Sequence, residues 1–177
     1  MKLIKSNVLF DGADDKENII IGFEGQEIMY VTSRKPDGDR GTEIILEGDD
    51  IVVTPAFIDS HSHIGMVRSG EPGKEEESNE QMNSVYPLVT ALHSIYMDDP
   101  SFTESVESGV LYSTVLPGSG NIIGGKAVLI CNFVQDIDQA YIMDIGIKAA
   151  LGYNPRSTVE WKGNRPSTRM GAVAMLT

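Results

Sequence analysis

Short apolar runs separated by Gly and Asp make up the first third of the chain. β-branched residues are frequent in these runs, which lie at residues 2–5, 18–23, 27–32, 43–47 and 51–54. β-branched side chains favour strands, whereas Gly and Asp favour the turns between them. The pattern therefore predicts a small antiparallel sheet that ends before Pro55.

The hydrophobic period changes to that of a helix in the middle of the chain. Apolar residues recur at helical spacing at Val85, Leu88, Val89, Leu92, Ile95 and Tyr96. A second helix is predicted over residues 101–108, with Asp99 or Ser101 as its N-cap and Gly109 at its end. Residues 168–176 predict a third helix, and residues 140–151 fit either a strand or a helix.

Strand, long loop, helix and strand follow one another between residues 56 and 116. Residues 56–64 and 110–116 predict the two strands, and residues 101–108 the helix between them. Such a crossover places its two strands parallel, so the pattern indicates an α/β fold. A further strand is predicted over residues 127–133, after a loop at residues 118–125.

Composition narrows the range of partners. The 177 residues carry a net charge of −12, which argues against nucleic acid, because phosphate binding needs clustered Lys and Arg. No apolar run approaches the roughly 20 residues of a membrane helix, and no secretory segment follows Met1. We therefore expect a cytoplasmic protein that acts on a small-molecule substrate, without nucleic acid or membrane as a partner. The composition is also compatible with a homo-oligomer.

The strongest chemical signal is the pair His61 and His63 at the end of the predicted strand 56–64. Alternate side chains of a strand point to the same face, so the two imidazoles can converge on one divalent ion, such as zinc. Asp59 shares this face, where its carboxylate would orient a histidine or form another hydrogen bond nearby. His-x-His also arises by chance, but its place at the end of an apolar strand favours a metal site.

Residues 55–63 (PAFIDSHSH) resemble the signature of the amidohydrolase superfamily, whose first barrel strand ends in His-x-His. Residues 98–102 (DDPSF) and 107–110 (ESGV) resemble the helix that leads to the second barrel strand. The imidazolonepropionase-like branch of that superfamily is similar at residues 116–125 (LPGSGNIIGG), 148–155 (KAALGYNP) and 167–171 (STRMG). The resemblance spans nearly the whole chain.

The resemblance implies a (β/α)8 barrel of the TIM type with a small β-sandwich domain. Residues 1–54 would form the small β-sandwich part, and residues 55–177 the N-terminal portion of the barrel. A complete barrel takes roughly 250 residues, so the resemblance also implies that the chain is incomplete and inactive by itself.

Members of the superfamily hydrolyse amides, cyclic amides and related C–N bonds with water that one or two metal ions activate. The resemblance thus implies that His61 and His63 bind a divalent metal, with zinc as the expected ion. Relatives bridge their metals with glutamate or a carbamylated lysine. Lys148 is a candidate for that role, although a lysine on the surface or in the barrel wall explains it more readily. Relatives commonly carry glutamate at the position of Tyr153, so the tyrosine departs from a bridged site, and the catalytic acid and base stay unidentified.

Two other interpretations compete with the hydrolase. In the first interpretation, the chain is a truncated or degenerate, non-catalytic barrel fragment with a structural or oligomerisation role. Alternatively, residues 120–127 (GNIIGGKA) resemble a phosphate-binding P-loop, but Ala127 replaces the hydroxyl that binds magnesium, and a strand follows instead of a helix. In a barrel this loop would border the substrate cleft, where Asn121 either contacts substrate or stabilises a turn.

Overall fold

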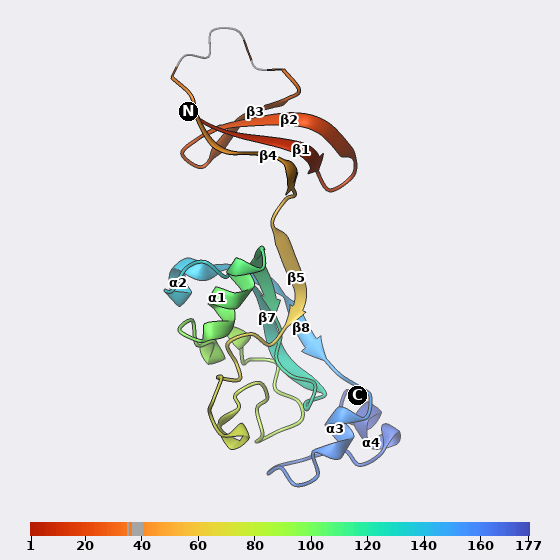
Figure 1. Cartoon of the computed structure of the whole chain (residues 1–177). Coiled ribbons are helices and arrows are strands. Elements are labelled where there is room, and N and C mark those ends of the chain that lie inside the picture. The colour runs from red at the N-terminus through yellow and green to blue at the C-terminus, as the bar shows by residue number, and fades with distance from the viewer. Residues whose placement is uncertain (35, 37–40) are drawn as a thin grey trace. The chain divides into compact units, whose positions relative to one another are not determined.

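The computed structural model describes residues 1–34, 36 and 41–177. It divides into two compact units, Met1–Pro55 and Ala56–Thr177, and each contains one four-stranded sheet (Figure 1). None of the helices in these described residues is long and apolar enough to cross a membrane.

The first unit is a mixed sheet. Its strands are β1 (Lys2–Phe10), β2 (Asp15–Glu24), β3 (Glu27–Thr32) and β4 (Glu43–Val53), in the order β3-β2-β1-β4. β1 and β2 are antiparallel, as are β2 and β3, but β1 and β4 are parallel, so the fully antiparallel sheet that we expected is wrong. Residues 43–47 and 51–54 also join into the single strand β4, which follows β1 with two shifts of register.

The second unit contains β5 (Phe57–Ser62), β6 (Val110–Val115), β7 (Ile123–Cys131) and β8 (Tyr141–Ala149), in the order β5-β6-β7-β8. β5 and β6 are parallel, as the crossover pattern predicts. The β6–β7 and β7–β8 pairs are antiparallel. Residues 140–151, which fitted either a strand or a helix, form the strand β8.

The expected α/β fold, a partial (β/α)8 barrel preceded by a β-sandwich, is wrong for the described residues. A barrel needs a helical crossover after each strand to bring the next strand back in parallel. Here a loop joins β6 directly to β7, and only the four-residue helix α2 (Ile137–Ala140) lies between β7 and β8. Both connections are too short for a crossover, so the strands pair antiparallel. The first unit is a single sheet rather than two packed sheets.

The helix of the crossover matches its local signals. α1 (Pro100–Glu107) begins after Asp99, whose side chain accepts a hydrogen bond from the backbone N–H of Ser101. It ends at Glu107 and is followed, after the C-cap Ser108, by Gly109, whose φ of 81° is readily available only to glycine. The remaining α-helices are short: α3 (Asn154–Ser157) and α4 (Arg169–Ala174), the latter inside the third predicted helix.

The helix expected from Val85 to Tyr96 is not present. Only the 3₁₀ turn η2 (Ala91–Ser94) is helical there; a second such turn, η1 (Gly73–Glu75), lies earlier in the chain. Val85 forms an isolated parallel bridge with β7, and the carbonyl of Val89 accepts a hydrogen bond from Lys126 of that strand. These hydrogen bonds with a distant strand hold the segment extended and override its local period.

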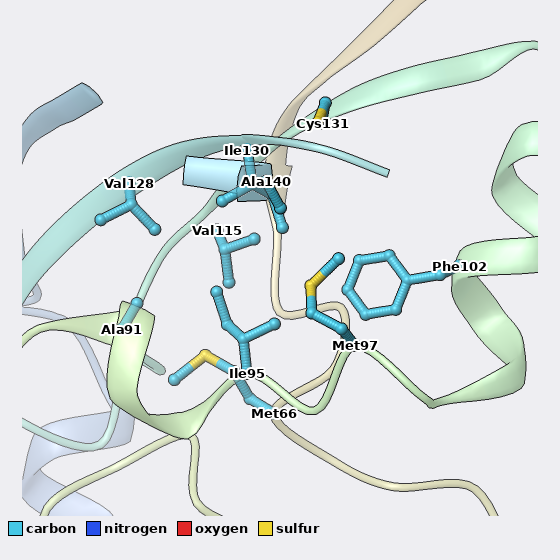
Figure 2. Packing of buried hydrophobic residues seen from close by; sticks show 10 residues of the cluster. All are labelled: Met66, Ala91, Ile95, Met97, Phe102, Val115, Val128, Ile130, Cys131 and Ala140. Atoms are coloured by element: carbon cyan, nitrogen blue, oxygen red, sulfur yellow. The ribbon is translucent and has the colours of Figure 1, made fainter. Parts of the chain in front are cut away.

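The core of the second unit gathers side chains from the sheet and from the crossover (Figure 2). Its buried members are Met66, Ala91, Ile95, Met97, Phe102, Val115, Val128, Ile130, Cys131 and Ala140. Of the apolar positions that suggested a helix after residue 85, Ile95 is part of this core and Leu92 packs against it, whereas Leu88 is 86% exposed. The first unit has a smaller cluster of its own, made of Leu9, Ile19 and Ile21.

Candidate functional site

His61 and His63 lie at the end of β5, on the same side of the strand. Their ring centroids are 5.6 Å apart, and the rings meet edge to face at 81°. His61 is exposed and His63 is partly buried. The parallel pairing of β5 with β6, in which Ser62 lies opposite Val115, supports this end of the strand. The two imidazoles are therefore neighbours on an ordered backbone.

One hydrogen bond determines which nitrogen of His63 carries the proton. Nδ1 of His63 lies 2.6 Å from the carbonyl oxygen of Leu116, the residue that follows β6. A carbonyl oxygen can only accept, so Nδ1 must donate its hydrogen. In the neutral ring, Nε2 then keeps the lone pair with which an imidazole binds a metal.

Lys148 of β8 lies beside His61. Its Nζ is 3.5 Å from Nε2 of His61, and the lysine is the only buried residue of its strand, with 9% of its surface exposed. Burial lowers the pKa of Lys148, because a charged ammonium loses hydration away from water. The structure thus brings Lys148 to the histidine pair from a strand 87 positions further along the chain.

Asp59 supports the backbone of the pair rather than a ring. One oxygen of its carboxylate accepts a hydrogen bond from the backbone N–H of His61, at 3.0 Å. The carboxylate therefore stabilises the backbone of β5 at His61. No hydrogen bond in the described part of the chain joins it to an imidazole nitrogen.

Asn121 lies in the loop after β6 and is completely buried. Its amide nitrogen donates to the carbonyl oxygens of Glu80 and Asn83, at 2.6 and 2.7 Å. These bonds attach the glycine-rich loop to residues 80–83 and not to the histidine pair. In the same loop, a Cβ atom at Gly120 would come within 2.3 Å of the Trp161 ring, so only glycine allows this packing.

Two further residues, Tyr153 and the third histidine of the chain, lie apart from these contacts. The side chain of Tyr153 is 73% exposed, at the start of α3. His93 is exposed on η2. Within residues 1–34, 36 and 41–177, no three His, Cys, Asp or Glu side chains come together as a metal cluster. The described chain therefore offers two imidazoles, with Lys148 as their neighbour.

Two parts of this arrangement carried little signal in the sequence. The carbonyl of Leu116 is a backbone group, and only the β5–β6 pairing brings it to His63. The burial of Lys148 could have been suspected because the residue is the single lysine in the apolar run of β8. Its contact with His61, however, depends on the order of strands in the sheet.

Comparison with known proteins finds two similar proteins, and both are named amidohydrolase. A crystal structure of an amidohydrolase from Thermotoga maritima MSB8 is 28% identical and superposes with a TM-score of 0.87 over 99% of this chain. A protein named amidohydrolase tasK from Hapsidospora irregularis is 27% identical over 143 residues, 72% of this chain. These matches support an assignment to the amidohydrolase superfamily.

The assignment covers only part of those amidohydrolases. The chain spans 45% of the Thermotoga maritima protein and 14% of tasK. No model of a protein family matches the chain. The superfamily assignment therefore rests on these two amidohydrolases, and the imidazolonepropionase-like branch stays a prediction.

Proposed function

We propose that this chain supplies two metal-binding histidines to a hydrolase that cleaves non-peptide C–N bonds, in an amide or a cyclic amide. Both relatives are named amidohydrolase, which supports hydrolysis at such a bond. The observation that carries the proposal is the hydrogen bond from Nδ1 of His63 to Leu116, because it leaves Nε2 as the free ligand nitrogen beside His61.

The donor atoms fit a zinc ion or a similar divalent ion. Neutral imidazole nitrogens are among the usual zinc ligands, and a catalytic zinc takes about three protein ligands and one water. The two histidines would be part of that set. A metal bound there lowers the pKa of its water toward neutrality and polarises the scissile carbonyl.

Lys148 is the candidate for a further ligand. Because burial lowers its pKa, more of the side chain is neutral amine at a given pH than for an exposed lysine. A neutral amine can add to carbon dioxide, forming an N–C bond and releasing a proton, and the resulting carbamate has oxygen atoms that bind metal. The position of Nζ near Nε2 of His61 supports this role.

The metal content of the purified protein tests the proposal. After reconstitution with zinc and dialysis, we expect His61→Ala/His63→Ala to lose the bound ion that the wild type retains, since both imidazole ligands are gone. His93→Ala is the matched control, because it removes the third histidine of the chain and should keep the ion. Wild-type zinc in the double variant would refute the role of His61 and His63.

A second measurement separates hydrolysis from metal binding alone. Amide and cyclic amide substrates should be cleaved by the zinc-loaded protein that carries this chain, and the His63→Ala variant should lose this activity. Zinc bound at the pair without cleavage of any such bond would argue for a non-catalytic metal protein.

A further inference from the structure

A cavity of about 640 Å³ opens in the second unit. This volume is within the range of about 300–1,000 Å³ that is usual for small-molecule sites. The segment at residues 76–82, the region around η2 and the loop at residues 160–162 form its walls. The cavity is therefore large enough for a small organic molecule.

Two lining residues connect the cavity to the backbone around His63, although neither histidine lines it. Met66, which lines it, donates its backbone N–H to the carbonyl of His63, at 3.1 Å. Pro117, which also lines it, directly follows Leu116, whose carbonyl holds Nδ1 of His63. A molecule in the cavity would thus lie beside the backbone that positions the proposed metal ligands.

The lining has an apolar part. Met82, Val89 and Trp161 line the cavity with side chains that are at least partly accessible, whereas Met66 and Ala91, 2% and 1% exposed, add little surface to it. Gly124 lines the cavity with its backbone. A Cβ atom at this position would come within 3.3 Å of the Pro117 side chain and 3.6 Å of the Lys148 side chain. An apolar body can therefore pack against these apolar side chains.

The polar lining is mainly acidic. Its glutamates are Glu76, Glu77, Glu80 and Glu160, and Lys162 is the basic residue among the lining side chains. In the part of the chain that the structure describes, none of these glutamates forms an ion pair within 4.0 Å. Glu77 accepts a hydrogen bond from the Tyr96 hydroxyl, which holds its carboxylate in place. Arg165, which stacks on Trp161, lies close enough to Glu80 to interact with its charge, so Glu76, Glu77 and Glu160 carry the negative charge that no ion pair of the described residues neutralises.

The spacing of these carboxylates favours an organic cation over a metal ion. No three acidic, histidine or cysteine side chains of the described residues approach closely enough to hold one metal ion. An amidinium, guanidinium or ammonium group donates several hydrogen bonds over a wider area, and charge-assisted hydrogen bonds to carboxylates are strong. Such a cation with an apolar body matches the acidic and the apolar residues of the lining.

We propose that this cavity binds an organic cation, an amine or amidine with an apolar body, as the substrate of the hydrolase. The role as substrate rests on the proposed function, whereas the binding itself does not depend on metal or on catalysis. The positive group would lie toward Glu77 and Glu160, and the apolar body toward Met82 and Trp161.

Binding of benzamidine tests the proposal, with benzamide as its uncharged counterpart of similar shape. Isothermal titration calorimetry on the 177-residue chain should show benzamidine binding at least about tenfold more tightly than benzamide, since only the amidine is charged. Trp161 is the single tryptophan of the chain and lines the cavity, so its fluorescence should change in the same titration. Equal affinity for the two compounds would overturn the proposal.

Glutamine variants locate the site. Glu77→Gln/Glu160→Gln keeps the shape of the lining and should weaken benzamidine binding by about tenfold or more. Glu75→Gln is the matched control, because Glu75 is exposed on η1 and lies outside the lining. A loss of similar size in both variants, or none in the double variant, would place benzamidine elsewhere and refute the site.

The outcomes separate this inference from the proposed function. His61→Ala/His63→Ala should leave benzamidine binding unchanged even where it abolishes zinc binding. Failure of zinc binding with intact benzamidine binding would count against the hydrolase alone. Failure of benzamidine binding with intact zinc binding would count against the cation site alone.

Discussion

At the scale of single residues, one buried amide connects the glycine-rich loop to the rest of the second unit. Asn121 donates two hydrogen bonds to the carbonyls of Glu80 and Asn83, and its side chain is inaccessible to solvent. A buried carbonyl that loses its donor costs free energy, because water does not easily replace the bond. Asn121 therefore holds the wall segment of the cavity in place.

Asn121→Ala should lower the free energy of unfolding by about 2 kcal/mol, since two hydrogen bonds are lost at once. Urea unfolding followed by Trp161 fluorescence measures this, because that ring packs against Gly120 in the same loop. Asn154→Ala is the control: Asn154 is exposed and donates one bond to Ser119, so its loss should cost less than about 1 kcal/mol. Equal costs for the two variants would contradict the structural role of Asn121.

At the scale of elements, the start of α1 shows how one carboxylate orders two segments. One oxygen of Asp99 accepts from Ser101 at the N-terminus of the helix, and the other accepts from the backbone N–H of Ser69 in the preceding loop. Burial raises the pKa of Asp99, but the hydrogen bonds from Ser101 and Ser69 and the nearby charge of Arg68 outweigh it, so the pKa is lowered overall. The charged form therefore stabilises the folded state.

Asp99→Ala should cost about 1–2 kcal/mol, because the cap is lost. Asp99→Asn keeps a capping oxygen and should cost less, so the difference between wild type and Asp99→Asn reports the charge. Because the folded pKa is lowered, this contribution is present above the ordinary aspartate pKa of about 3.9 and is lost as the pH falls through the lower folded pKa. Thermal unfolding at neutral and acidic pH measures it, and a difference that persists at low pH would contradict the argument.

At the scale of the whole molecule, the second sheet ends in an apolar strand. β8 is the last strand in the order of its sheet, and its apolar side chains are largely exposed, including Met143 at 51%. A long apolar edge strand tends to associate with other strands. The net charge of −12 opposes such contacts by repulsion between copies.

Met143→Lys should raise the concentration at which copies of the chain associate by roughly tenfold, or about 1.4 kcal/mol, because lysine at an edge disfavours strand pairing. Analytical ultracentrifugation measures this. Met170→Lys is the matched control, because it makes the same change of charge on α4, where the methionine is 80% exposed. Reduced net charge by itself would favour association in both variants, so an equal response would show that β8 is not the contact.

The sequence by itself determined features that depend on residues a few positions apart. The cap and end of α1, the strand that carries the histidine pair and the parallel pairing across the crossover all follow from local signals. Alternation along an extended strand likewise indicated that His61 and His63 would share a face, and their rings are neighbours. Such features need no knowledge of which distant segments meet.

The tertiary structure alone decided the pairings of β7 and β8 and the surroundings of the histidines. The antiparallel β6–β7 pair replaced the expected barrel crossover, and hydrogen bonds to β7 kept residues after Val85 extended. The bond from His63 to Leu116 and the contact of Lys148 with His61 join residues 53 and 87 positions apart. The physical reason is that backbone hydrogen bonds and burial between distant segments outweigh local preferences of a fraction of a kcal/mol per residue.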